Sequence, residues 1–215
     1  MNRLLAALGA RIRRSSQSER PPGDVARLTA TGASAFSKYE RTGRPATLAA
    51  ALTAFRDAVT AASPGHPDLA MTLSNLGAAL LALFEQTGDA AALGEAISAE
   101  RRAVELTPAG DPGLATMLSN LGNALGTRFE WAGDAADLDA AVDAGRRAVE
   151  LTPAGDPDLS LRLSNLGTEL FSRFEWAGDA ADLDEAISAG HRAVELIPPG
   201  HPGLAAMLSN LGGYL

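Results

Sequence analysis

The sequence predicts an all-α protein, a solenoid of antiparallel helix hairpins with a 45-residue period. Alanine and leucine are abundant while aromatic residues make up only 5% of the chain, which favours closely packed helices over a β-rich core. The string L-S-N-L-G recurs at intervals of 45 residues. Its four copies start at Leu73, Leu118, Leu163 and Leu208. The units that start at Pro112 and Pro157 are identical at 30 of 45 positions, so they are the same structural unit.

The repeat register divides the chain into successive units. A degenerate first unit precedes three regular ones, and a fifth unit contains helix A only. The boundaries are 22–66, 67–111, 112–156, 157–201 and 202–215. Because no hairpin of this kind can bury its apolar stripe alone, the units must stack on their neighbours.

Residues 1–21 precede the repeats as a basic arm that we expect to be flexible. Its short apolar run, Leu4 to Leu8, is followed by arginines instead of only being preceded by them, which is a poor secretory pattern. Weak contact of the arm with a membrane or a partner is the alternative. No stretch of the chain approaches the roughly 20 apolar residues of a membrane-spanning helix.

Prolines, aspartates and glycines mark two helices in each unit. In the third unit Asp111 and Pro112 have the arrangement of an N-cap and a first helical residue, so helix A should start there. Gly133 stands where a helix C-terminus favours a left-handed residue. Asp134 should then cap helix B, and Asp137 should lie against the positive end of its dipole. Helix B should end near the following Thr-Pro.

The apolar residues of each helix have helical spacing. In helix A of the second unit they follow an i, i+3, i+4, i+7 pattern that places them on one face. They are Leu73, Leu76, Gly77, Leu80 and Phe84. The predicted buried face of helix A is therefore defined by the same residues that repeat.

These positions also match the tetratricopeptide pattern. In the second unit the matching residues are Leu73, Leu76, Gly77, Leu80, Ala96, Ala103 and Pro108. The chain thus resembles a tetratricopeptide repeat (TPR) protein over most of its length, which implies a TPR-like superhelix that binds protein partners. The family's usual period is about 34 residues. Here 7 residues are added between Gly77 and Ala96 and 4 before the next unit, about two turns and one turn of helix.

The aromatic residue that the family carries on helix B is retained only in the first unit, as Phe55. The later units have Glu100, Gly145 and Gly190 at that position. A mid-helix glycine costs roughly 1 kcal/mol relative to alanine. We therefore expect these glycines to permit close helix approach, beneath Phe129 and Phe174.

Long repeats of this type resemble the arrays found beside caspase-like CHAT protease domains in actinobacterial proteins, and the asparagine-bearing repeats of kinesin light chains. The resemblance implies two alternative functions. One is a stand-alone interaction scaffold, and the other is a sensor arm of a larger CHAT-type protease. Reading the DNA downstream of Leu215 would separate them.

A polar stripe opposite the buried face of helix A is the candidate partner-binding site. Taking Leu73 as the centre of the buried face, an advance of about 100° per residue places Asn75 on the opposite side, where it should be exposed. The stripe residues are Asn75, Asn120, Thr127, Trp131, Asn165, Glu169, Ser172, Trp176 and Asn210. By the resemblance, successive A helices line a concave groove. Asparagine both donates and accepts hydrogen bonds, which suits an extended peptide, and tryptophan adds anchoring area.

A structural interpretation of the same residues stays open. The asparagines could bond neighbouring helices within the solenoid, as buried amides must. Trp131 and Trp176 could merely cover the turns between helices A and B.

Composition and motifs weigh against several other functions. A net charge of −8 disfavours nucleic acid and anionic membranes and favours a protein or peptide partner. The absence of cysteine excludes thiolate chemistry and fits a cytoplasmic location. No phosphate-binding glycine loop or G-x-S-x-G motif is present, so we expect no enzyme, no cofactor and no metal site.

Two other groups of polar residues have simple structural interpretations. His66 and His201 occupy the position that Asp111 and Asp156 hold elsewhere, so they are expected to be helix caps. An acidic group lies at one helix start and is explained by the helix dipole. Its members are Asp179, Asp182, Asp184 and Glu185.

The fifth unit has no helix B of its own to cover its apolar residues, whereas solenoids normally finish with a polar cap. Three explanations stay open: the natural chain continues, the sequence is a fragment, or a second copy covers the end as a homodimer.

Overall fold

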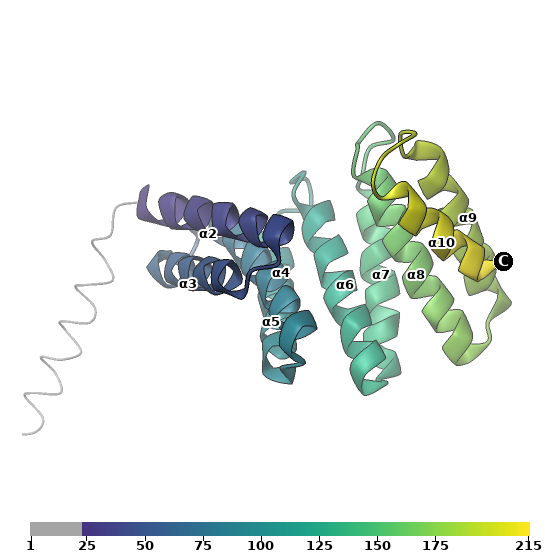
Figure 1. The fold of residues 1–215 in the computed structure, drawn as a ribbon, viewed down its shortest axis with the longest axis horizontal. Helices are drawn as coiled ribbons and strands as arrows, with labels where there is room; N and C mark the ends of the chain where they lie inside the picture. Colours follow the sequence, from purple (N-terminus) through teal and green to yellow (C-terminus); the bar gives the residue numbers. More distant parts are fainter. Residues whose placement is uncertain (1–22) are drawn as a thin grey trace, which may run out of the picture. The chain divides into compact units, whose positions relative to one another are not determined.

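A computed structural model describes residues 23–215, and every regular element in that part of the chain is an α-helix (Figure 1). The basic arm expected at residues 1–21 lies outside the described residues. The helices are α2 (Gly23–Thr42), α3 (Pro45–Ala61), α4 (Leu69–Thr87), α5 (Ala90–Leu106), α6 (Leu114–Ala132), α7 (Ala135–Glu150), α8 (Leu159–Ala177), α9 (Ala180–Leu196) and α10 (Leu204–Tyr214). The predicted all-α class is confirmed. The helices fall into two compact units that divide between Ala92 and Leu93, inside α5.

The first unit is built on the α2/α3 hairpin, against which α4 packs. Phe55 of α3 is almost fully buried and lies against Gly32 of α2, where an added Cβ atom would stand 2.5 Å from the phenyl ring. Only glycine therefore allows α2 to approach the ring this closely. A buried hydrogen bond of 2.8 Å joins the hydroxyl groups of Thr29 and Thr72, so α2 also contacts α4 directly.

Helix α4 is long and apolar enough, by length and composition, to cross a membrane, which the sequence analysis did not expect. Half of its 18-residue apolar window is buried inside the fold. The buried face of a core helix meets the same criteria, so this single helix is weak evidence for a membrane span.

The second unit stacks two complete hairpins, α6/α7 and α8/α9, and then α10 (Figure 1). Its apolar core lies where successive hairpins meet, because each layer buries its stripe on the next. One cluster combines Val142 of α7 with Leu166 and Leu170 of α8 and with Leu211 and Tyr214 of α10. The partial fifth unit therefore covers the apolar face of the α8/α9 hairpin.

Glycine and aspartate define the turn inside the α6/α7 and α8/α9 hairpins, as predicted. Gly133 and Gly178 follow α6 and α8 with φ of 73° and 74°, in the left-handed region that favours glycine. Asp134 then caps α7 by accepting a hydrogen bond from the backbone N–H of Ala136 at 3.0 Å. The α2/α3 hairpin differs, because Gly43 also has a positive φ but Arg44 stands at the N-cap of α3 and makes no side-chain cap bond.

The start of helix A differs from the prediction. α6 begins at Leu114 instead of Pro112, because the Asp111 carboxylate accepts a hydrogen bond from the backbone N–H of Gly113 and holds a turn ahead of the helix. His201 does the same through Nδ1, which accepts from the N–H of Gly203 at 3.1 Å. His66 has the equivalent bond. The expectation that both histidines cap a helix was wrong: each accepts a hydrogen bond within the turn ahead of the helix, and the N-caps of α4 and α10 are Asp68 and Gly203.

Candidate functional site

The asparagines of the candidate stripe are half-buried, not fully exposed. Asn165 of α8 donates a hydrogen bond of 3.4 Å from Nδ2 to the hydroxyl of Ser119 on α6. Asn210 of α10 donates the same bond, again at 3.4 Å, to Ser164 on α8. The expectation of exposure was wrong for Asn165 and Asn210 because this flank of α8 and of α10 packs against the preceding A helix. These contacts support the interpretation that Asn165 and Asn210 bond neighbouring helices within the solenoid.

Other polar contacts extend this row between successive A helices. Arg162 of α8 is almost fully buried and donates to the hydroxyl of Thr116 on α6 at 2.8 Å. The hydroxyl groups of Thr168 and Tyr214 are 3.1 Å apart and join α8 to α10. The A helices of the second unit are thus held in one register by repeated side-chain bonds.

Glu169 does not belong to an exposed stripe, because it is only 6% exposed. Its carboxylate fills a slot between α6 and α7, where Cβ atoms added to Gly122 and Gly145 would lie 2.7 and 2.4 Å from its two oxygens. Among the described residues Oε2 has no hydrogen-bond partner. Burial raises the pKa of the Glu169 carboxyl to about 8. The group is therefore a packing element within the repeat interface.

The same slot recurs one repeat later with a different occupant. Tyr214 stands 45 residues after Glu169 and contacts the positions of Gly167 and Gly190. Gly145 and Gly190 do permit close approach, as predicted, but the approaching groups come from the next A helix, not from beneath Phe129 and Phe174. The sequence carries a signal of this contact. Of two positions that are 24 residues apart, one holds a large side chain and the other a small one. The pairs are Phe55 with Ala79, Glu100 with Ala124, Gly145 with Glu169, and Gly190 with Tyr214.

Both tryptophans are 59% exposed at the C-terminal ends of α6 and α8. The indole of Trp176 meets the ring of Phe129 edge-on, with ring centroids 5.5 Å apart. Thr127 and Ser172, one turn earlier, are half-buried. The binding role predicted for these residues and for Asn75 and Asn120 stays a prediction.

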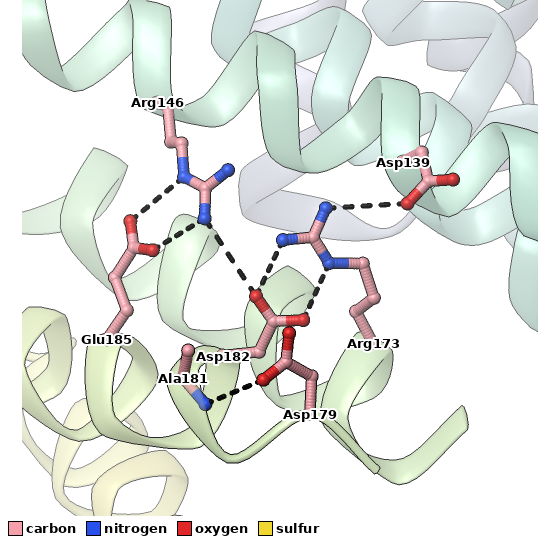
Figure 2. A network of polar contacts seen from close by, with 7 residues as sticks. All are labelled: Asp139, Arg146, Arg173, Asp179, Ala181, Asp182 and Glu185. Carbon is pink, nitrogen blue, oxygen red and sulfur yellow. Dashed lines mark hydrogen bonds and ion pairs between the residues drawn. The ribbon is translucent and has the colours of Figure 1, made fainter. Parts of the chain in front are cut away.

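An ion-pair network at the hairpin turns was missed by the sequence analysis. Arg173 of α8 makes two hydrogen bonds to Asp182 of α9, at 2.8 and 2.6 Å, and reaches Asp139 of α7 at 3.4 Å (Figure 2). Arg146 of α7 is paired in the same way with Glu185 of α9, at 3.0 and 2.6 Å. The network therefore links three helices across two repeats.

Asp182 was attributed to dipole compensation, whereas its side chain is almost fully buried and engaged by an arginine. The hydrogen bonds from Arg173 lower the pKa of the Asp182 carboxyl. Arg128 and Asp137 form the equivalent pair one repeat earlier. The sequence signal was an arginine followed nine residues later by an aspartate, which occurs in the repeats 112–156 and 157–201. In the repeat 67–111 both residues are replaced together. There the two positions hold Leu83 and Ala92.

The described residues contain no group of three or more histidine or acidic side chains that could hold a metal ion. The side chains of the site can form hydrogen bonds, ion pairs and apolar contacts. These are the interactions of a recognition surface.

Comparison with known proteins supports the fold. Residues 114–158 match the tetratricopeptide repeat family. No curated protein sequence matches the chain at a significant level.

Several solved structures share the arrangement of helices. A putative kinesin light chain from Podosopora anserina with nearly identical TPR-like repeats has a TM-score of 0.62 at 15% identity, covering 88% of this chain and 86% of its own. BtubC (BKLC) from P. vanneervenii has a TM-score of 0.57 at 14% identity, and the match covers 89% of this chain and 82% of BtubC. MamA has a TM-score of 0.54 at 20% identity, and the match covers 89% of this chain and 80% of MamA. Residues 114–158 thus match a tetratricopeptide repeat, and the described part of the chain shares the helical repeat fold of these structures.

Proposed function

We propose that this chain is a non-catalytic interaction scaffold that binds a protein or peptide along the A helices of its second unit, α6, α8 and α10. The observation that carries the proposal is the repeated Asn–Ser bond, from Asn165 to Ser119 and from Asn210 to Ser164. It holds three consecutive A helices in one register, so a partner would meet a surface that is already ordered. Preformed surfaces of this kind lose less conformational entropy on binding.

Residues beside this row offer the contacts that an extended chain needs. Leu161 is 54% exposed near the start of α8, and Thr127 and Ser172 are half-buried near the ends of α6 and α8. Hydroxyl groups can bond a peptide backbone, while the exposed leucine supplies apolar area. Asn120 belongs to the same register position as Asn165. Glu169 is excluded from the proposed surface because it is buried.

The test places a bulky charge on the proposed surface without touching the asparagine row. Ser172→Arg should abolish capture of the partner, because the long side chain would obstruct the row. Ser188→Arg is the matched control, since Ser188 is an exposed serine on helix B of the same hairpin. Proteins captured from a lysate of the source organism would be quantified by mass spectrometry, with circular dichroism to confirm equal folding. Equal capture by Ser172→Arg and Ser188→Arg would contradict the A-helix surface.

The remaining parts of the proposal have other supports. Cytoplasmic location, and a preference for protein over nucleic acid or membrane, rest on the cysteine-free composition and the net charge of −8. The sensor-arm alternative rests on the sequence resemblance to CHAT-associated repeats, and a homodimer through α10 rests on the exposed apolar side chain of Leu208, which is 49% exposed. Sequencing of the flanking DNA tests the first of these, and light scattering tests the second.

A further inference from the structure

The two tryptophans stand at equivalent places in consecutive repeats, and both keep more than half of their surface in solvent. Tryptophan is among the residues most enriched at the energetic centres of binding surfaces, together with tyrosine and arginine. Trp176 is also held in place, since its indole makes an edge contact with Phe129 of the preceding repeat. An indole that is both ordered and exposed is suited to contact a partner.

A cleft of about 500 Å³ lies beside Trp176, between the first turn of α7 and the turn that joins α8 to α9. One part of its lining is apolar and comes from Ala135, Leu138 and Ala177 together with the indole. The cleft belongs entirely to the second unit. It is separate from the asparagine row, because it is formed at the hairpin turns.

The charged lining gives the cleft a negative sign. It contains the carboxylates of Asp139, Asp179 and Asp182 and the guanidinium of Arg173, a net charge of −2. Both oxygens of Asp182 are engaged by Arg173. Asp139 is 67% exposed at the far side of Arg173, and Asp179 uses Oδ1 to cap α9 while staying exposed (Figure 2). The exposed carboxylates that a ligand would meet are therefore those of Asp179 and of Asp139, which also accepts a hydrogen bond of 3.4 Å from Arg173.

We propose that this cleft binds an arginine side chain of a protein partner, with the guanidinium against the indole of Trp176 and beside Asp139. A planar guanidinium stacks on an indole face, pairs with carboxylates and is weakly hydrated, so it meets all three features of the cleft. A lysine ammonium is compact and strongly hydrated and would gain less from the indole. The partner segment is thus basic, which agrees with the net charge of −8 on this chain.

Indole NMR signals provide a direct test, because the chain has only two tryptophans. The probe is Nα-acetyl-arginine methylamide, titrated into the full ¹⁵N-labelled chain, and the Trp131→Phe variant assigns the Trp176 signal. We expect the Trp176 signal to shift and saturate with the arginine probe, and to shift less with the lysine analogue. The citrulline analogue has the same shape without the charge, so it should leave the signal almost unchanged.

Variants of α7 test the charge directly. Asp139→Asn should weaken binding of the arginine probe about fivefold, because it removes one exposed charge near the ligand. Asp143→Asn makes the same change one turn further along the helix, outside the lining, and should bind as the wild type does. A Trp176 signal that does not respond to arginine, that responds equally to citrulline, or that is equally affected by both variants would overturn the proposal. Capture by the A-helix surface is read from Ser172→Arg, so the two proposals can fail separately.

Discussion

Two successive repeat interfaces of the second unit use the same slot and fill it differently. Between the α6/α7 hairpin and α8, the slot formed by Gly122 and Gly145 holds the carboxyl of Glu169. Between the α8/α9 hairpin and α10, the slot of Gly167 and Gly190 holds Tyr214. The slots are equivalent because all of their residues are related by the 45-residue period.

The two occupants differ in how well their polar atoms are satisfied. Tyr214 places its ring against Phe171, with centroids 5.0 Å apart, and its hydroxyl lies 3.1 Å from that of Thr168. Glu169 Oε2 has no hydrogen-bond partner in the described part of the chain. An unsatisfied buried carboxyl costs stability whenever it is ionised. The comparison teaches that equivalent interfaces of one repeat array can differ in pH sensitivity, because the slot holds a buried carboxyl in one and a tyrosine in the other.

The largest expected effect comes from filling the first slot twice. Gly145→Glu adds a Cβ atom 2.4 Å from Glu169 Oε2 and a second carboxyl, so we expect a loss of about 4 kcal/mol in the free energy of unfolding. Urea denaturation measures it.

Two further variants control that measurement. Gly145→Glu combined with Glu169→Ala should recover most of the loss, because it reproduces the pairing of Glu100 with Ala124. Gly94→Glu, at a helix B glycine with nothing within 4 Å of an added Cβ, should cost little. If Gly94→Glu and Gly145→Glu lowered the free energy of unfolding equally, the space in the slot would not be the reason that position 145 requires a small residue.

Emptying the second slot should have the next largest effect. Tyr214→Ala removes a buried ring that covers Gly167 and Gly190, and we expect it to lower the free energy of unfolding by about 3 kcal/mol. Leu215→Ala truncates the adjacent residue, which is exposed, and should be nearly neutral. If both truncations were neutral in urea denaturation, α10 would not stabilise the preceding hairpin.

Removing the charge from the first slot should stabilise the protein in a pH-dependent way. The pKa of Glu169 is about 8 in the fold, against an ordinary value of 4.5. Below pH 4.5 the carboxyl is protonated in both states. Between pH 4.5 and 8 the unfolded chain loses this proton while the folded chain retains it, so stability falls as the pH rises and levels off above pH 8.

Glu169→Gln lacks this titration and should exceed the wild type by about 2 kcal/mol at pH 8 and by little at pH 4. Thermal or urea unfolding across this range measures the difference. Glu175→Gln, an exposed site on the same helix, is the control and should show no such trend. A constant difference between Glu169→Gln and the wild type at all pH values would show that Glu169 titrates normally in the fold.

The smallest effect is expected from the hydroxyl pair of the second slot. Thr168→Val keeps the shape of the side chain and removes its hydroxyl, so it should cost about 1 kcal/mol. Thr168→Ser retains the hydroxyl and should cost less. If valine were tolerated better than serine, the bond to Tyr214 would contribute nothing to stability.

Several local features could be predicted because their cause lies within a few residues. Gly133 and Gly178 end helix A through backbone freedom, and Asp134 and Asp179 cap helix B through their own side chains. Helix A started two residues late because the Asp111 carboxylate can hold either a helix or a turn, and spacing alone does not choose between them.

The candidate site was predicted less well because it depends on neighbouring repeats. A helical wheel treats the face of helix A opposite the buried stripe as exposed to solvent. In the second compact unit, however, the preceding A helix packs against the flank of this face, and its serines accept hydrogen bonds from Asn165 and Asn210. The wheel placed Glu169 with them, while in the fold it is inserted beside two glycines of the preceding hairpin.

The sequence by itself determined the period, the all-α class and the two-helix unit, because repetition, apolar spacing and capping residues act locally. Only the tertiary structure decided which side chains cross between repeats. The ion pair of Arg146 with Glu185 joins residues 39 apart, and Glu169 enters a slot made by the previous repeat. Such contacts depend on how one hairpin is rotated on the next, and the pattern within a single unit contains no information about that rotation.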